Sequence, residues 1–331
     1  MLRLCLSAYV ASVAALTTPP PSLSRRQVIG STSAAAALAA TGPPSLVRAA
    51  DYKLQPGAKL ITGENFPTAS FGLQVYDDTT AEQLTLIALE LGYRNFFASV
   101  LARNQKGFAR AIKKSGVPRD ELFICGSVLS NQAQGFDAAY KLSARGCKEN
   151  LEAFAVGGID YVDMIMLDYP GTDDASIKGQ WKALEEMHAA GTAKTLAVSN
   201  FSPKQLDVVA SVATSKATMP TVNQLPYGVG FAGYYNGKAA EIVAENRKRG
   251  VVVQAWSPLR KALKGRARDA CAEIGQKYGK SAAQVGLKWI AQANGGATYT
   301  TQTKSKEHFK EDLEIFDFTL TAEEIATLSA I

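Results

Sequence analysis

Residues Gly92 to Gln105 read Gly-Tyr-Arg-Asn-Phe-Phe-Ala-Ser-Val-Leu-Ala-Arg-Asn-Gln, and they place a short strand directly ahead of a helix. The residues Asn95–Ala98 are rich in the aromatic side chains that strands favour, while Asn104–Ser115 has the apolar spacing of a helix. The same succession of a short apolar run and a stretch of helical length recurs from Ala69 to the region of Thr300. This stretch therefore indicates a fold made of repeated strand–helix units.

Eight such units are expected. The expected strands are Ala69–Leu73, Asn95–Ala98, Leu122–Val128, Val162–Leu167, Leu196–Val198, Thr221–Asn223, Val251–Ala255 and Thr298–Thr300. The expected helices include Ala81–Leu91, Asn104–Ser115, Phe136–Phe154, Ile177–Ala190, Pro203–Val212, Ala239–Arg249 and Ala267–Tyr278. Strands such as Val162–Leu167 are mainly apolar and do not alternate with polar residues, which is typical of strands buried on both faces. Eight units in about 270 residues predict an α/β fold of the (β/α)₈ TIM barrel type.

Two further observations refine this architecture. The segment from Lys59 to Pro67 reads as two short strands around a turn at Gly63, which predicts an N-terminal β-hairpin ahead of the barrel. A doubly wound sheet is the alternative, and it would carry a Gly-x-Gly-x-x-Gly turn after an early strand. That motif does not occur in the chain. The barrel is therefore the favoured architecture.

The first fifty residues differ in kind from the rest, because they hold four Arg and no Asp, Glu or Lys. Two apolar runs, Leu4–Leu16 and Val28–Ala40, are separated by Arg25-Arg26, and small residues follow near Ala49. This layout predicts a bipartite twin-arginine targeting leader over residues 1–50 and a barrel domain over residues 51–331. It resembles thylakoid-lumen targeting in algae, so the expected location is the chloroplast and its thylakoid lumen. An exported bacterial protein, a stromal protein and a chance Arg pair in an Ala-rich tail are the alternatives.

Charge and composition exclude several classes of partner. The net charge is +6, and the leader contributes +4 of it, so only +2 belongs to the remaining residues. These residues carry no Lys/Arg cluster with interleaved aromatics, so no nucleic-acid partner is expected. No apolar run reaches the roughly 18 residues of a membrane-spanning helix, so an integral membrane protein is not expected. Four widely spaced Cys and two His predict neither a disulfide framework nor a metal site.

Several separate segments, in the right order over about residues 58 to 325, resemble the aldo-keto reductase family. They are Phe66-Pro67 with Phe71-Gly72-Leu73, Gly92-Tyr93-Arg94, Ser115 to Ile124, Ile159 to Asp163, Ala197 to Phe201, Val222 to Gln224, Trp256 to Leu259, Gly279 to Val285 and Ile315 to Phe318. The resemblance implies a TIM barrel and reduction of aldehydes and ketones with hydride from NADPH.

The resemblance also locates four positions that form the family's catalytic tetrad of Asp, Tyr, Lys and His. In this sequence those positions hold Phe97, Ala102, Ser127 and Asp168. Neither His of the chain lies near the end of the fourth barrel strand, so no shifted alignment restores the family's His. A positioned general acid contributes about 10²- to 10⁴-fold to a rate. The substitutions therefore predict no catalytic residue of the usual kind.

The resemblance further implies six cofactor-binding positions. Three of them match contacts to the nicotinamide carboxamide, one an aromatic stacked on the nicotinamide ring, and two contacts to the pyrophosphate; they are Ser199, Asn200, Gln224, Trp256, Ser257 and Leu259. Other interpretations stay open for four of them. Ser199 and Asn200 could cap the helix that begins near Pro203, Trp256 could be a core aromatic, and Gln224 could satisfy backbone groups.

The half of the cofactor groove that would hold adenosine differs more. Gln302 and His308 stand where the family has a Lys and an Arg, and Asp312 is expected to repel an anion there. Lys and Arg bind phosphate through charge-assisted hydrogen bonds that are about twice as strong as neutral ones. The sequence thus leaves open whether NADP(H) or NAD(H) binds, and it predicts no metal.

Two functions follow from these observations. The first is a catalytically impaired aldo-keto reductase-like protein, a pseudoenzyme with a binding or scaffold role, which holds a small-molecule ligand in an apolar pocket at the barrel mouth formed by Phe96, Phe97 and Trp256. The alternative is an atypical NAD(P)(H)-dependent oxidoreductase acting on carbonyl compounds, with Asp168 or a water as the proton source. A hydrolase or lyase has no supporting motif, and the sequence identifies no protein partner.

Overall fold

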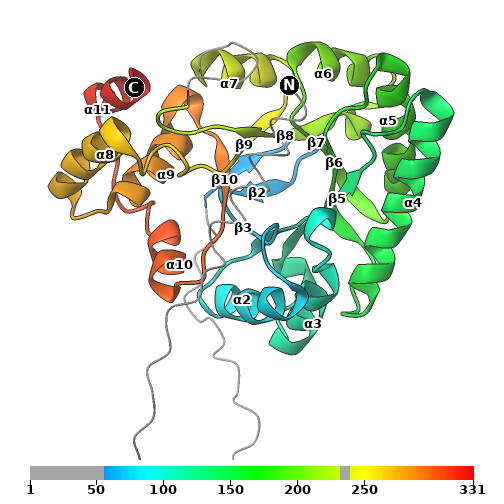
Figure 1. The fold of residues 1–331 in the computed structure, drawn as a ribbon, viewed down its shortest axis with the longest axis horizontal. Helices are drawn as coiled ribbons and strands as arrows, with labels where there is room; N and C mark the ends of the chain where they lie inside the picture. The colour runs from blue at the N-terminus through cyan, green and yellow to red at the C-terminus, as the bar shows by residue number, and fades with distance from the viewer. Residues whose placement is uncertain (1–55, 232–238) are drawn as a thin grey trace, which may run out of the picture. The chain divides into compact units, whose positions relative to one another are not determined.

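The chain forms a closed barrel of eight parallel strands in a computed structural model that describes residues 56–231 and 239–331. The strand order around the barrel is β10-β3-β4-β5-β6-β7-β8-β9, so each strand lies beside its sequence neighbour and β10 closes onto β3 (Figure 1). A separate antiparallel pair, β1 (Gly57–Lys59) and β2 (Asn65–Pro67), precedes it. The predicted TIM barrel and N-terminal hairpin are confirmed, while the leader predicted over residues 1–50 lies outside the described residues.

All eight expected barrel strands are present, with ends that differ by a few residues from the predicted ones. They are β3 (Ala69–Gly72), β4 (Asn95–Ala98), β5 (Phe123–Leu129), β6 (Val162–Asp168), β7 (Ala193–Ser199), β8 (Pro220–Pro226), β9 (Val252–Trp256) and β10 (Thr298–Thr301). The helices are α2 (Asp78–Glu90), α3 (Gln105–Ser115), α4 (Phe136–Ala155), α5 (Asp174–Ala189), α6 (Pro203–Ala210), α7 (Ala239–Lys248), α8 (Gly265–Tyr278), α9 (Ala282–Gln292), α10 (Lys306–Leu313) and α11 (Ala322–Ser329). The last three were not predicted, and Figure 1 shows them grouped with α8 on one side of the barrel.

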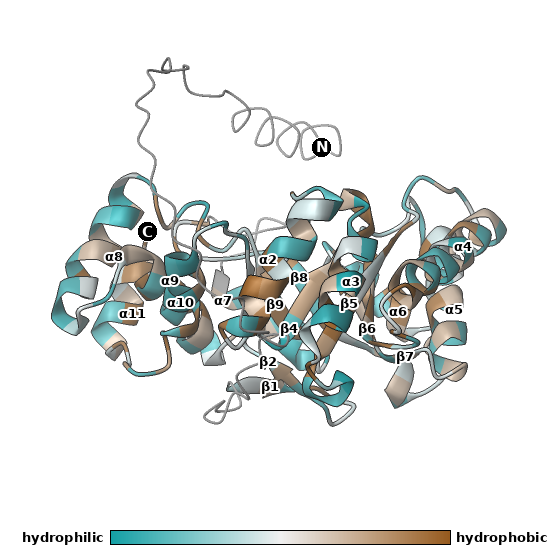
Figure 2. Cartoon of the chain, turned by 90° about the horizontal axis from the view of Figure 1, so that it is seen from below, coloured by the Kyte–Doolittle hydropathy of each residue, from teal (hydrophilic) through white to brown (hydrophobic). Residues whose placement is uncertain are grey.

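The barrel strands are buried on both faces, as their mainly apolar runs predict. Outward-facing residues such as Ile124 and Ile165 belong to a large core between the strands and the helices. Inward-facing residues such as Met164 and Met166 belong to a smaller core inside the barrel. In Figure 2 the hydrophobic colour is concentrated on the strands and on the helix sides turned toward them. Alternate residues of each strand therefore belong to different cores.

The hairpin closes the N-terminal end of the barrel. Phe66 of β2 is fully buried and its ring lies 5.0 Å from that of Phe123, the first residue of β5. Asn95, the first residue of β4, donates from Nδ2 to the Pro67 carbonyl at 2.8 Å. With this end sealed, the C-terminal ends of the strands are the open end, where barrel enzymes carry their sites.

Close packing of α4 against α5 gives a stability prediction. A Cβ added at Gly179 would lie 2.8 Å from the carbonyl carbon of Phe136 and closer still to its oxygen. Because backbone atoms cannot move aside as a flexible side chain can, Gly179→Ala is expected to lower the free energy of unfolding by about 2 to 3 kcal/mol. Urea unfolding measures this change. Ala189→Ser, on the exposed side of the same helix, is the control and should change stability by less than about 0.5 kcal/mol.

Candidate functional site

Four polar side chains form a row inside the open end of the barrel. Asp168, Ser199, Gln224 and Gln254 are register partners on the consecutive strands β6, β7, β8 and β9. Register partners in a parallel sheet share a face, and Met166, two residues before Asp168, belongs to the barrel-interior core. The row therefore faces the interior, at the end where barrel enzymes place reacting groups.

Asp168 is the titratable member of this row. Its carboxyl is buried, with the residue only 6% exposed, and this desolvation raises its pKa to about 6, while a hydrogen bond from Ser199 works in the opposite direction. The negative charge is also felt by the thiol of Cys125, whose pKa is raised by burial first and then by Asp168. Near neutral pH the carboxyl group is therefore present in both its protonated and its ionised form.

A chain of hydrogen bonds continues from Asp168 across the barrel mouth. Asn200 donates from Nδ2 to Ser199 Oγ at 2.8 Å, and Trp256 donates from Nε1 to Asn200 Oδ1 at 3.1 Å. Asn200 has a φ of 64° and Ser257 a φ of 50°, both in the left-handed region that non-glycine residues seldom adopt. Strained backbone of this kind concentrates at functional sites. The hydrogen bond between Trp256 and Asn200 therefore joins the ends of β7 and β9, where Asn200 and Ser257 have left-handed backbone conformations.

Three structural interpretations of these residues are wrong. The cap of α6 is Ser202, whose hydroxyl accepts from the backbone N–H of Gln205, so Ser199 and Asn200 do not cap it. Trp256 is half-buried and hydrogen-bonded at the barrel mouth, and it belongs to no core. Gln224 donates from Nε2 to Gln254 Oε1 at 2.7 Å, so its partner is a side chain and not the backbone.

The other positions matched to the tetrad hold no proton-transferring group at the mouth. Phe97 is 2% exposed and packs in the barrel-interior core, and Ala102 ends the short 3₁₀ helix η1 (Val100–Ala102). The Ser127 hydroxyl accepts a hydrogen bond from the Val100 backbone N–H at 3.2 Å, which ties η1 to β5. The expected pocket lined by Phe96 is also wrong, because Phe96 faces outward and packs 5.5 Å from the ring of Phe108 on α3.

The segment expected to face adenosine is partly different from the prediction. Gln302 is exposed and donates to Gln74 Oε1 at 2.7 Å, and His308 Nδ1 lies 3.3 Å from the hydroxyl of Thr303. Asp312 is buried, and this desolvation raises its pKa to about 7. The expectation that Asp312 repels an anion at the groove is therefore wrong, because its carboxyl is withdrawn from the surface.

Comparison with known proteins decides the family. A sequence model described as the Aldo/keto reductase family matches residues 66–331. The chain belongs to the aldo/keto reductase family. It is 30% identical over 276 residues to an aldo-keto reductase of Mycolicibacterium vanbaalenii, covering 83% of this chain and 92% of the relative. It is 30% identical over 282 residues to a glyoxal reductase of Bacillus subtilis, covering 84% and 93%.

Solved structures agree with this assignment. An aldo/keto reductase of Brucella melitensis superposes with a TM-score of 0.72 at 25% identity, over 83% of this chain and 99% of that one. The barrel of this family member therefore has the same architecture as that solved structure. The comparisons do not test the substitutions at Phe97, Ala102, Ser127 and Asp168, so the loss of the tetrad stays a prediction from the sequence.

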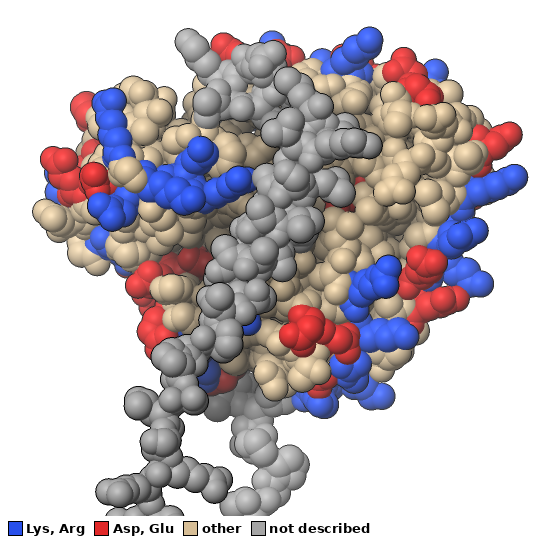
Figure 3. All heavy atoms as spheres, in the orientation of Figure 1, with Lys and Arg blue, Asp and Glu red and all other residues tan. Residues whose placement is uncertain are grey.

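One basic cluster, which follows Leu259, was not predicted from the sequence. Arg260, Lys261, Lys264 and Arg266 follow Leu259 directly, are exposed, and form no ion pair within the described part of the chain. Figure 3 shows Lys and Arg side chains gathered over this segment and α8. The signal was present as five cations in nine residues, counting Arg268. It was passed over because the segment holds no aromatic residue.

The residues present fit a nicotinamide dinucleotide. The nicotinamide positions Ser199, Asn200 and Gln224 are brought together at the mouth beside Trp256. The hydroxyl of Thr300 is buried without a hydrogen-bond partner among the described residues, which leaves a polar group for a ligand to satisfy. The cations after Leu259 supply charge for phosphates.

Within residues 56–231 and 239–331, no group of three or more His, Cys, Asp or Glu side chains could hold a metal ion. Over the same ranges, no helix has the length and apolar character needed to cross a membrane.

Proposed function

We propose that this aldo/keto reductase is an atypical NAD(P)(H)-dependent oxidoreductase that acts on carbonyl compounds, and that Asp168 supplies the proton. One observation carries the proposal. Asp168 is a buried carboxyl group on the interior face of β6, at the open end of the barrel, with a pKa raised to about 6 by its burial. A carboxyl group in this state can serve as a general acid near neutral pH.

The chain's own residues then divide the work. Ser199, Asn200 and Gln224 would hold the nicotinamide carboxamide, Trp256 would lie against the ring, and the cations after Leu259 would hold the phosphates. When bound, the cofactor supplies hydride to the carbonyl carbon. Protonated Asp168 donates its proton to the carbonyl oxygen, so that an alcohol forms and a carboxylate remains. That carboxylate takes its next proton from water.

The hydrogen-bonded chain at the mouth supports this role for Asp168. Ser199 lies beside the carboxyl group as its register partner and accepts a hydrogen bond from Asn200, to which Trp256 donates from β9, two strands away. A donor held in one orientation loses little freedom on reaching the transition state. The relatives named as reductases also favour turnover over the pseudoenzyme interpretation, which gains no support from them.

A binding protein without turnover is the second candidate, favoured by one specific observation. Phe97 fills the barrel interior at a position where the family places an Asp, and Ala102 stands where it places a Tyr. Neither side chain can transfer a proton. In this case a small molecule would bind at the mouth and leave unchanged.

Cofactor titration tests the proposal through Trp256. The other two Trp residues, Trp181 and Trp289, are at most 1% exposed, so a ligand at the mouth should quench mainly Trp256. NADPH or NADH is expected to quench the fluorescence saturably, with a Kd below about 100 μM, in the usual range of metabolite affinities. Trp256→Phe should remove the quenching while calorimetry still detects binding. If calorimetry detects binding of neither nucleotide to the wild type, the oxidoreductase proposal fails and the second candidate stands.

The location is a separate proposal. We propose that residues 1–50 direct the protein to a chloroplast and onward to the thylakoid lumen, supported by the paired Arg25-Arg26 before the apolar run Val28–Ala40. The mature protein is expected to begin at Ala50 or Asp51, and N-terminal sequencing of native material measures this. Native protein that begins at Met1 would contradict the proposal.

A further inference from the structure

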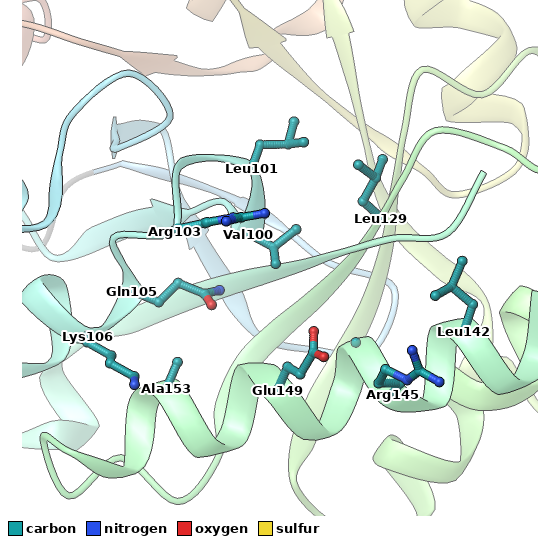
Figure 4. Close-up of a pocket in the computed structure, with 11 residues that line it drawn as sticks. Val100, Leu101, Arg103, Gln105, Lys106, Leu129, Leu142, Arg145, Glu149 and Ala153 are labelled. Carbon is teal, nitrogen blue, oxygen red and sulfur yellow. The ribbon is translucent and has the colours of Figure 1, made fainter. Parts of the chain in front are cut away.

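A pocket of about 690 Å³ lies outside the barrel, between α3 and α4. In Figure 4, residues of η1 and the start of α3 face residues of α4 across it, and Leu129 at the end of β5 lies at one side. Its apolar wall includes Val100, Leu101, Leu129 and Leu142. The volume falls within the range of about 300–1,000 Å³ that is typical of small-molecule sites.

The charged side chains around this pocket form no ion pair within residues 56–231 and 239–331. Arg103, Lys106 and Arg145 carry positive charge and Glu149 carries negative charge, so the lining has a net charge of +2. None of the four forms an ion pair with another described residue. Arg145 and Glu149 are four residues apart on α4, where an ion pair is commonly made, and they do not make it. The pocket thus presents an excess of uncompensated positive charge.

The N-terminus of α3 adds to this charge. Gln105 and Lys106 are its first two residues, and both line the pocket. The capping residue Asn104 makes no side-chain cap hydrogen bond, so in the described chain the backbone N–H groups of Gln105 and Lys106 have no acceptor. Unsatisfied N–H groups at a helix N-terminus favour a negative charge beside them.

Gln105 is the buried polar group that faces the pocket. It is 5% exposed, and its Nε2 donates to the Ala98 carbonyl at 3.0 Å and to Asn150 Oδ1 at 2.7 Å. Its Oε1 accepts no hydrogen bond from any described residue. The two bonds from Nε2 fix the amide on the pocket wall, and Oε1 is left free to accept a hydrogen bond from a ligand hydroxyl.

We propose that this pocket binds an amphiphilic anion, a carboxylate or phosphate headgroup on a short alkyl chain. The three cations and the α3 N-terminus take the headgroup, and the leucines and Val100 take the chain. None of Asp168, Ser199, Gln224 and Gln254 lines this pocket, and the hydrogen bond from the Val100 N–H to Ser127 Oγ ties η1 to β5 beside it. The proposal does not depend on oxidoreductase activity.

Calorimetry with the full chain and four probes tests both halves of the ligand. Decanoate and decyl phosphate are expected to bind saturably, while decanol and inorganic phosphate bind at least about tenfold more weakly, because each lacks one of the two recognised parts. Comparing the two anions tells which headgroup is preferred. If decanol binds as tightly as decanoate, or inorganic phosphate as tightly as decyl phosphate, the amphiphile proposal is overturned.

Charge variants locate the site. Arg103→Gln and Arg145→Gln are each expected to weaken decanoate binding about five- to tenfold, since each removes a charge-assisted hydrogen bond. Glu149→Gln should strengthen it severalfold by removing repulsion. Lys148→Gln is the matched control, because Lys148 is exposed on the same helix and lies 3.6 Å from Glu152. The assignment would be overturned if Lys148→Gln weakened decanoate binding as much as Arg145→Gln, or if Glu149→Gln did not strengthen it. All four substituted side chains are exposed, so folding is expected to be unaffected.

Discussion

Replacing Asp168 by Asn is expected to lower kcat/KM for carbonyl reduction by about 100-fold or more, because an amide cannot donate a proton in the way a carboxylic acid does. The wild-type rate should fall about tenfold per pH unit above pH 6, since the protonated fraction of a group with a pKa of about 6 falls in that way. Steady-state kinetics with NADPH and a panel of aldehydes, between pH 5 and pH 9, measures both effects. The Asp168→Asn variant should lose the pH dependence together with the rate.

Two controls separate chemistry from folding. Asp160→Asn makes the same chemical change on the exposed surface and should leave kcat/KM unchanged. Asp168→Asn itself should be more stable than the wild type at pH 8, by about 3 kcal/mol. The raised pKa means that ionising the carboxyl group at this pH costs more free energy in the folded state than in the unfolded chain, and the amide does not ionise. A variant that binds cofactor, is as stable as the wild type and reduces aldehydes at the wild-type rate would show that Asp168 is not the proton donor.

The second large effect is on stability, at Asp312. Burial raises its pKa from 3.8 to about 7. Between pH 3.8 and pH 7 the carboxyl group is therefore protonated in the folded state and ionised in the unfolded chain, which lowers the free energy of unfolding as the pH rises. The penalty is absent below pH 3.8 and grows as pH rises to 7. Asp312→Asn, which keeps the shape of the side chain, is expected to add about 2 kcal/mol of stability at pH 5 and about 4 kcal/mol at pH 8.

Urea unfolding at pH 5 and pH 8 checks this prediction. Asp317→Asn is the matched control, because Asp317 is exposed and its pKa is lowered by the ion pair with Lys280 at 2.7 Å. Removing that carboxylate should cost up to about 1 kcal/mol at pH 8, the opposite sign. An equal gain for Asp312→Asn at both pH values would mean that the buried carboxyl is not the source of the effect.

The barrel could be predicted from the sequence because its strands are short apolar runs at regular spacing. β4 was predicted to the residue, since Asn95–Ala98 is bounded by Gly92 and by the turn near Ser99. The three C-terminal helices were missed for a related reason. α9 follows α8 with no strand between them, so the alternation of strands and helices gave no cue, although Ser281 and Gln284 form a capping box at its start.

The site was harder to predict than the fold, because side-chain direction depends on pairing between strands. Met164 to Leu167 are all apolar, so over these four residues the period of two that would mark the interior face of β6 is absent from the sequence. Only the register with β7, which pairs Asp168 with Ser199, shows that the carboxyl faces inward. The burial of Asp312 likewise depends on how α10 packs, which its half-buried neighbour Glu311 and the exposed His308 do not reveal.

The N-terminal hairpin has a kinetic consequence. Phe66 and Leu60 close the N-terminal end of the barrel, so a molecule that reaches Asp168 enters and leaves through the C-terminal end. In the proposed reaction the dinucleotide and the carbonyl compound would therefore share one opening, because the packed interior core leaves no second route. The molecule that binds second would then have to leave before the first one.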